Sequence, residues 1–141
     1  MKQPLYVFRP LLNVEAVDSW ARAQGFRNRT PLNEYHVTIA YSREPVDIGQ
    51  YQPSEKTVSA YGTGLKILGD EALVMVIKSI DLLRDHTRAR YFGCSHDYAS
   101  YIPHVTISLQ FPRVDSRLIS RAAPFAETLY FGPEEFRDIP V

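Results

Sequence analysis

The amino-acid sequence predicts an α+β domain built on antiparallel sheets, and three observations support this. First, β-type and helical runs alternate irregularly, whereas a doubly wound parallel sheet needs strand and helix in strict turn. Second, short apolar runs in the middle of the chain are separated by glycine-containing turns, which is typical of hairpins. Third, 141 residues with 45% hydrophobic and 23% charged side chains suit one folded domain, and no linker or low-complexity segment divides them. We therefore expect residues 1–141 to form a single domain.

The first half of the chain is predicted to form a strand, a helix, a second strand and a loop. Residues 5–8 are rich in β-formers, and Pro10 closes this first strand. Apolar residues then recur at helical spacing between an N-cap at Asn13 and a stop at Gly25. The last two predictions are a strand over 34–42 (EYHVTIAYS) and a loop over 43–54.

The second half is predicted to contain more and shorter elements. Glycines separate three short apolar runs that read as a meander of strands. A helix is predicted from Ser79 to about Phe92, with Gly93 ending it, and no element is predicted after Pro133. The other predictions are strands at 57–61, 65–68 and 73–78, an extended stretch at 98–103, a strand at 104–111, a helix near 115–121 and a strand at 128–131.

Charge and cysteine content exclude several classes of protein. The chain has 16 Lys and Arg against 16 Asp and Glu, whereas a protein that grips long nucleic acid needs a basic surface. We therefore expect no long nucleic-acid partner, although a local pocket can still hold a small anion. The single cysteine, Cys94, excludes an intramolecular disulfide and fits a reducing cytoplasm. No secretory signal or bilayer-spanning apolar run is visible, so we expect a cytoplasmic protein without a membrane partner; its oligomeric state stays open.

One tetrapeptide, His-Val-Thr-Ile, occurs at residues 36–39 and again at residues 104–107. Both copies lie in predicted strands, where successive side chains point to opposite faces. In each copy the valine and isoleucine therefore share an apolar face suited to a core. The histidine and threonine share the other face. Two such strands, one from each half of the chain, could line a cleft from both sides.

Paired histidines and threonines suit the cleavage of a phosphodiester without a metal or cofactor. The reaction needs a base for the attacking hydroxyl and an acid for the leaving oxygen, and histidine can fill either role near neutral pH. Threonine hydroxyls and a protonated histidine can donate hydrogen bonds to the phosphate oxygens as charge builds there. A single His-x-Thr would more simply be a structural strand residue pair. The matched pair favours catalysis.

The two His-x-Thr motifs resemble those of the 2H phosphoesterases, which include RNA 2′,3′-cyclic phosphodiesterases and the phage anti-CBASS nucleases. The segments 5–7, 35–42, 98–108 and 131–134 resemble the anti-CBASS branch. This resemblance implies a bilobal fold, with two antiparallel sheets facing a central cleft and helices flanking them. It also implies metal-independent hydrolysis of 3′–5′ bonds in cyclic di- and trinucleotide immune signals such as cyclic GMP-AMP. The neighbouring ribose 2′-hydroxyl would be the nucleophile, and the phage would thereby evade CBASS immunity.

The resemblance also implies roles for individual residues. Two histidines would be general base and general acid, in an order that stays open, and two threonines would steady the scissile phosphate. A tyrosine would stack on a nucleobase, and a glutamate near the C-terminus would contact the ligand. Because the only tryptophan is Trp20, Phe136 is the candidate for a second stacking ring. The implied site residues are His36, His104, Thr38, Thr106, Tyr6 and Glu134, with Glu135 as the alternative to Glu134.

Three other interpretations stay open beside this one. An RNA-end enzyme of the same superfamily would share the motifs, and a sponge would bind a cyclic nucleotide without cutting it. A zinc site has suitable residue types in His86, Cys94, His96 and His104, but their spacings of 8, 2 and 8 match no usual structural-zinc pattern.

Tyrosines flank the two motifs and are candidates either for base stacking or for packing at strand edges. These tyrosines are Tyr35, Tyr41, Tyr98 and Tyr101.

Overall fold

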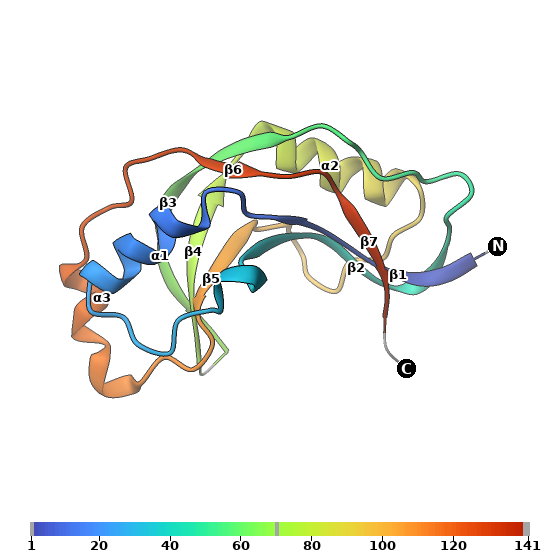
Figure 1. The fold of residues 1–141 in the computed structure, drawn as a ribbon. Coiled ribbons are helices and arrows are strands. Elements are labelled where there is room, and N and C mark those ends of the chain that lie inside the picture. Colours follow the sequence, from blue (N-terminus) through green and yellow to red (C-terminus); the bar gives the residue numbers. More distant parts are fainter. Residues whose placement is uncertain (1, 70, 140–141) are drawn as a thin grey trace.

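The structure is a computed structural model that describes residues 2–69 and 71–139. Within these residues, seven strands form one curled antiparallel sheet in the spatial order β6-β3-β4-β5-β2-β1-β7 (Figure 1). The predicted α+β class with antiparallel strands and flanking helices is confirmed. The strands are β1 (Lys2–Pro10), β2 (His36–Asp47), β3 (Val58–Leu68), β4 (Ala72–Lys78), β5 (His104–Ser108), β6 (Leu129–Phe131) and β7 (Glu135–Asp138). The helices are α1 (Val14–Ala23), α2 (Ile80–Tyr91) and α3 (Arg117–Arg121), with 3-10 turns η1 (Leu32–Glu34) and η2 (Arg113–Asp115).

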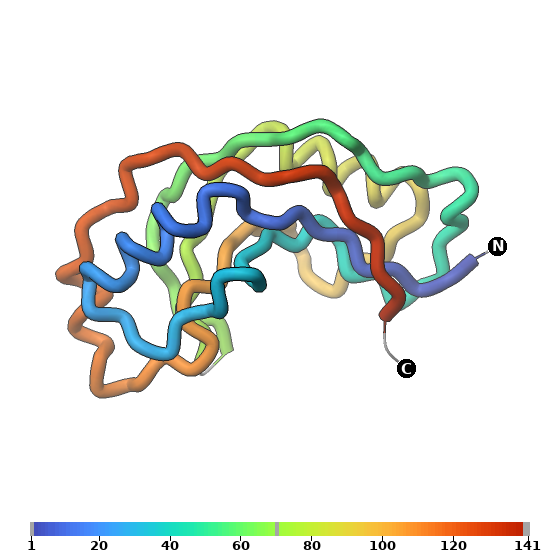
Figure 2. The backbone as a smooth tube through the Cα atoms, viewed as in Figure 1, coloured from blue at the N-terminus to red at the C-terminus, as the bar shows by residue number. Residues whose placement is uncertain are grey.

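The sheet has two parts that meet at the repeated tetrapeptide. One part contains β7, β1 and β2, and the other contains β6, β3, β4 and β5. Among the described residues, β2 and β5 pair only at Val37 and Val105. The two sheets implied by the resemblance are thus joined into a single sheet at this point. In the first part, the N-terminal strand and the C-terminal segment run side by side (Figure 2).

One strand extends beyond its predicted end and another was not predicted at all, in both cases because a neighbouring strand provides hydrogen-bonding partners. β2 continues to Asp47, through the start of the predicted loop, because β1 begins at Lys2 and pairs with it there. β7 lies in the tail for which the sequence predicts no element, and it pairs with the otherwise free edge of β1. Backbone groups at a sheet edge accept such a partner whatever the local propensity of the added strand.

The meander is also simpler than predicted. The two short strands expected at 57–61 and 65–68 are one strand, β3, with an irregularity in its pairing to β4 between Gly62 and Gly64. A Cβ atom at Gly62 would lie 2.9 Å from the sulfur of Met75, so a larger residue there would force the Met75 side chain to move. β5 ends at Ser108, short of the predicted residue 111.

Helix α2 covers one face of the sheet (Figure 1). It begins as predicted, because the Ser79 side chain accepts a hydrogen bond from the backbone N–H of Leu82 at 3.1 Å. The same hydroxyl donates to the carbonyl of Ser59 at 2.7 Å, which ties the helix start to β3. Gly93, with a φ of 98°, follows its end. Among the described residues, no helix is long and apolar enough to cross a membrane.

Ser79→Ala should lower the free energy of unfolding by about 1–2 kcal/mol, because it removes a helix cap and leaves the Ser59 carbonyl without its donor. Urea denaturation measures this loss. The matched control is Ser116→Ala, since Ser116 precedes α3 without a capping hydrogen bond from its side chain. Equal stability losses in the two variants would contradict the role given to Ser79.

Candidate active site

The two motifs lie beside each other on one face of the sheet. The antiparallel pair of Val37 with Val105 fixes the register, so residues one step away on opposite sides face each other. His36 therefore lies beside Thr106, and Thr38 lies beside His104. The intervening apolar residues are fully buried, whereas the four motif side chains are only partly buried. The structure thus brings together all four: His36, Thr38, His104 and Thr106.

Both motif histidines are held through the same ring nitrogen. Nδ1 of His36 lies 2.7 Å from the carbonyl oxygen of Glu34, and Nδ1 of His104 lies 2.9 Å from that of Ile102. Because a carbonyl oxygen can only accept, Nδ1 carries the hydrogen in each ring. Nε2 is then left for chemistry, as an acceptor in the neutral ring and as a donor in the protonated one. Because the two contacts are equivalent, they leave the choice of base and acid open.

An aromatic cluster lies beside His36. The Tyr6 hydroxyl is 3.2 Å from Oγ1 of Thr38, and burial raises the pKa of this tyrosine. Its ring stacks on Phe8 at 4.9 Å between centroids, and both rings meet the His36 ring edge to face. The guanidinium of Arg137 lies 4.6 Å over Phe8. Tyr6 thus joins the motif residues, together with two neighbours that the sequence prediction did not include.

A signal for one of these two neighbours was present in the sequence. Phe8 follows Tyr6 by two residues in a predicted strand, and the period of two places both on one face. Arg137 is different, because it reaches this face only through the pairing of β7 with β1, which sets it opposite Tyr6. No local pattern in the tail predicts that pairing.

A cleft of about 580 Å³ opens beside Thr38 and His104. Strand β2 lines one side and the β3–β4 hairpin lines the other, while the segment 96–102 that leads into β5 lines the remainder. The cleft is large enough for a small organic ligand. A bound phosphate beside Thr38 and His104 would face both motifs at once.

Comparisons with known proteins identify the family of the chain. The family model described as anti-CBASS protein Acb1 matches residues 3–140. The chain belongs to the anti-CBASS Acb1 family. The resemblance to the anti-CBASS branch is therefore confirmed.

Relatives in this family differ in length from the chain. An anti-CBASS protein Acb1 of Sphingomonas paeninsulae is 40% identical over 147 residues, which cover 97% of this chain and 23% of that protein. The Acb1 of Enterobacteria phage T4 is 33% identical over 101 residues, covering 69% of this chain and 64% of its own. The chain thus spans less than a quarter of the bacterial relative. A solved structure of a phosphoesterase superposes with a TM-score of 0.50 at 13% identity, covering 100% of both chains, which shows a similar fold.

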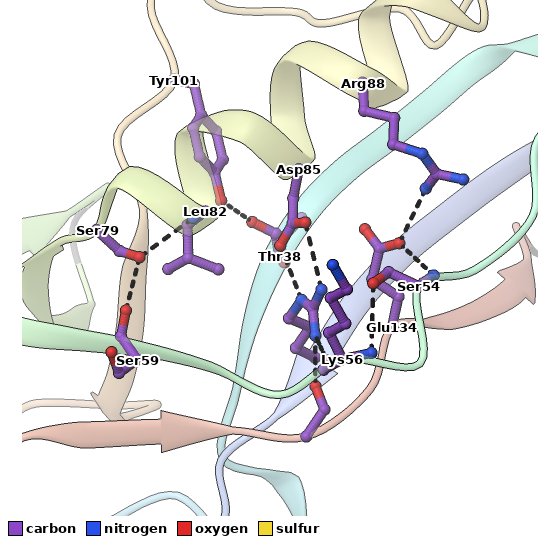
Figure 3. Close-up of polar contacts among 12 residues, drawn as sticks. Thr38, Ser54, Lys56, Ser59, Ser79, Leu82, Asp85, Arg88, Tyr101 and Glu134 are labelled. Carbon is purple, nitrogen blue, oxygen red and sulfur yellow. Dashed lines mark hydrogen bonds and ion pairs between the residues drawn. The ribbon is translucent and has the colours of Figure 1, made fainter.

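In this Acb1 family member, the segment 96–102 is tied to β2 at the site. The Tyr101 hydroxyl donates to the carbonyl oxygen of Thr38 at 2.7 Å (Figure 3). Its ring stacks on His86 at 4.1 Å and 3°. Nδ1 of His86 in turn donates to the carbonyl of Ile39 at 2.8 Å. Neighbouring backbone carbonyls of β2 are thus held by α2 and by the segment that leads into β5.

The structure places Glu134 apart from the motif residues, on the side of the sheet that faces α2. Its buried carboxylate accepts from the backbone N–H of Ser54 at 2.7 Å and lies 3.3 Å from Nη1 of Arg88 (Figure 3). Burial raises the pKa of this carboxyl. Glu135 is paired with Phe8 in the sheet register, and its side chain lies 3.9 Å from that of Arg137. Since side chains alternate along a strand, Glu135 lies on the face of the motifs.

The other sequence candidates lie outside the four motif residues. Phe136 packs on Tyr51, with ring centroids 4.7 Å apart, so it faces the core. Cys94 is buried, and burial raises the pKa of its thiol to about 11. Burial also lowers the pKa of His86, whose ring lies 4.6 Å from that of His96. In the part of the chain that the structure describes, no three His, Cys, Asp or Glu side chains are grouped so as to hold a metal ion.

Proposed function

We propose that this chain is a metal-independent phosphodiesterase that hydrolyses 3′–5′ bonds of cyclic di- and trinucleotide immune signals, such as cyclic GMP-AMP. The observation that carries the proposal is the register of β2 with β5, which sets two histidine–threonine pairs around one point on an open face. Membership of the anti-CBASS Acb1 family supports this substrate class. Its biological effect would be to let a phage evade CBASS immunity.

Each histidine has one role in the first step of the proposed reaction. The histidine with a neutral ring takes the proton of the ribose 2′-hydroxyl at Nε2 as the oxygen attacks the adjacent phosphorus. The bond from phosphorus to the 5′-oxygen breaks, and the other histidine protonates that oxygen from its Nε2–H. The product is a linear nucleotide with a 2′,3′-cyclic phosphate. Water then opens this cyclic phosphate with the two roles reversed, which leaves a 3′-phosphate.

The remaining polar groups stabilise and position the phosphate and its nucleosides. The hydroxyls of Thr38 and Thr106 donate to the non-bridging oxygens, where charge builds in the transition state. Tyr6 orients Thr38 through its hydroxyl and offers its ring to a nucleobase. Of the two C-terminal glutamates, we assign the ligand contact to Glu135, because it shares the face of the motifs. Glu134, the residue implied by the resemblance, then has a structural role with Ser54 and Arg88.

The proposed partner is a small cyclic oligonucleotide, and the proposed place of action is the host cytoplasm. The phage relative supports this location, because a phage protein that removes a host signal must act where the signal is. The zero formal net charge favours a small ligand over long nucleic acid.

The test compares two substrates in the presence of excess EDTA. We expect the chain to turn over 3′,3′-cyclic GMP-AMP with a higher kcat/KM than an RNA oligonucleotide that ends in a 2′,3′-cyclic phosphate. A preference for the RNA end would instead assign the chain to the RNA-end enzymes. Tight binding of cyclic GMP-AMP without turnover would identify a sponge. Loss of activity in EDTA and recovery with zinc would contradict a metal-independent reaction.

The rate of cyclic GMP-AMP hydrolysis should pass through a maximum as pH is varied. The reaction needs one motif histidine neutral and the other protonated, so kcat/KM falls on both sides of the optimum. Initial rates across a pH series at low substrate concentration measure this profile. A rate that rises steadily with pH would contradict the pairing of one acid with one base.

A further inference from the structure

The face that carries the motifs continues across the sheet onto β3 and β4. Val74 pairs with Thr106, and Lys66 pairs with Val74, so these three residues form one row across three strands. Adjacent strands lie about 4.8 Å apart, which sets the backbone of Lys66 about 10 Å from that of Thr106. In the next row, Val76 pairs with His104. The β3–β4 hairpin therefore extends the face that carries the motifs, on the side of His104.

Lys66 is a cation of the cleft that is available to a ligand. Its side chain is exposed and lines the cleft, and among the described residues it has no hydrogen-bond or ion-pair partner. Arg43 also lines the cleft, but its guanidinium lies 3.3 Å from the carboxylate of Asp97. An anion that enters this cleft from solution therefore meets Lys66 as a positive charge that is not paired with any carboxylate of the described residues.

The walls near Lys66 are aromatic and aliphatic. Tyr98 is 77% exposed although it lines the cleft, and Tyr41 and Ile102 are also exposed there. Exposed tyrosine rings are platforms on which a nucleobase of any sequence can stack. This combination suits a nucleotide, because the cation can bind the phosphate while the aromatic rings stack on the base.

We propose that Lys66 and Tyr98 form a second subsite, which binds the phosphate and nucleoside that do not react. This inference rests on the proposed function, in which the scissile phosphate lies over the two His-x-Thr motifs. A cyclic dinucleotide carries a second phosphate on the far side of its ring, one nucleotide away from the first. It can therefore engage the motifs and Lys66 together, whereas a substrate with a single phosphodiester cannot. The subsite therefore favours cyclic oligonucleotides over substrates with a single phosphate.

The test measures Lys66→Gln on two substrates that share a 3′–5′ bond. With 3′,3′-cyclic GMP-AMP, kcat/KM should fall about tenfold, mainly through KM, and the salt dependence of KM should weaken. With adenylyl-(3′–5′)-guanosine, which has one phosphate, kcat/KM should stay unchanged. Lys66→Arg should restore most of the loss. The matched control is Lys78→Gln, because Lys78 ends β4 and is exposed outside the cleft lining.

Tyr98 provides a second measurement of the same subsite. Tyr98→Ala should raise KM for cyclic GMP-AMP, and Tyr98→Phe, which keeps the stacking ring, should not. Equal losses on both substrates in Lys66→Gln, or no loss on either, would overturn the inference and leave the proposed function intact. If the wild-type chain cleaved neither substrate, the proposed function would fail. In that case calorimetry would compare the affinity of the wild type and of Lys66→Gln for cyclic GMP-AMP. A lower affinity in the variant would support the subsite, and an unchanged affinity would refute it.

Discussion

His36→Ala and His104→Ala should each reduce the turnover of cyclic GMP-AMP by about 10²–10⁴-fold while leaving the fold intact, because each removes one of the two proton-transfer groups. Single-turnover kinetics measure the loss, and thermal unfolding of each variant checks the fold. Substantial activity in either variant would contradict the assignment of base and acid to these residues.

Asparagine variants separate the two ring nitrogens. In His36→Asn and His104→Asn, the side-chain amide can still donate toward the carbonyl that Nδ1 contacts, but nothing replaces Nε2. These variants should be as inactive as the alanine variants if Nε2 performs the chemistry. His96→Ala is the matched histidine control, since His96 lines the same cleft outside the motifs, and it should lose far less activity. If the asparagine variants kept their activity, the contribution of each histidine to turnover would instead come from Nδ1.

Arg9→Met should lower the free energy of unfolding by about 3–5 kcal/mol, because it leaves one partner of a buried ion pair alone. The fully buried Arg9 side chain donates to Asp85 at 2.8 and 3.2 Å and to the carbonyl of Gly132 at 2.9 Å, and it also contacts the Lys56 carbonyl. It thereby joins β1, α2 and the segments that lead into β3 and β7. Urea denaturation measures the loss.

The pH dependence and a matched variant separate this pair from an ordinary surface contact. Burial already raises the pKa of Asp85, and removing Arg9 should raise it further. When the pKa of a carboxyl is raised in the folded state, the free energy of unfolding of the protein falls as pH rises through that pKa. The loss of stability in Arg9→Met, relative to the wild type, should therefore be smaller at acidic than at alkaline pH. Arg27→Met breaks a pair with Asp115 in which the guanidinium is exposed, so it should lower the free energy of unfolding much less than Arg9→Met does. Equal losses in Arg9→Met and Arg27→Met would contradict the account.

Local patterns were sufficient for the elements whose determinants lie within the segment itself. The helix after Ser79 could be predicted because a capping residue, an amphipathic run and a following glycine all lie within fifteen residues. The single strand β3 and the added strand β7 could not, because each depends on what the neighbouring strand offers. The pairing partner of a strand can be far away in the sequence, so a short segment of sequence does not reveal it.

The same distinction holds for the candidate site. The period of two in a strand was enough to place the histidine and threonine of each motif on one face. Their mutual placement depends on the single pair of Val37 with Val105, which couples segments 68 residues apart. Glu134 and Glu135 are neighbours in the sequence, and only the register of β7 against β1 shows which of them shares the face of Tyr6. Lys66 enters the cleft through the β3–β4 pairing in the same way.

In the proposed mechanism, the two His-x-Thr motifs together cleave a phosphodiester without a metal. The most direct test of this mechanism is the identity of the products formed from 3′,3′-cyclic GMP-AMP in excess EDTA and ¹⁸O-labelled water. Mass spectrometry should show an unlabelled linear nucleotide with a 2′,3′-cyclic phosphate, followed by a 3′-phosphate that carries one ¹⁸O atom. This order is expected because the ribose 2′-hydroxyl attacks first and water attacks second. A product with a 5′-phosphate, or no product while EDTA is present, would contradict the account.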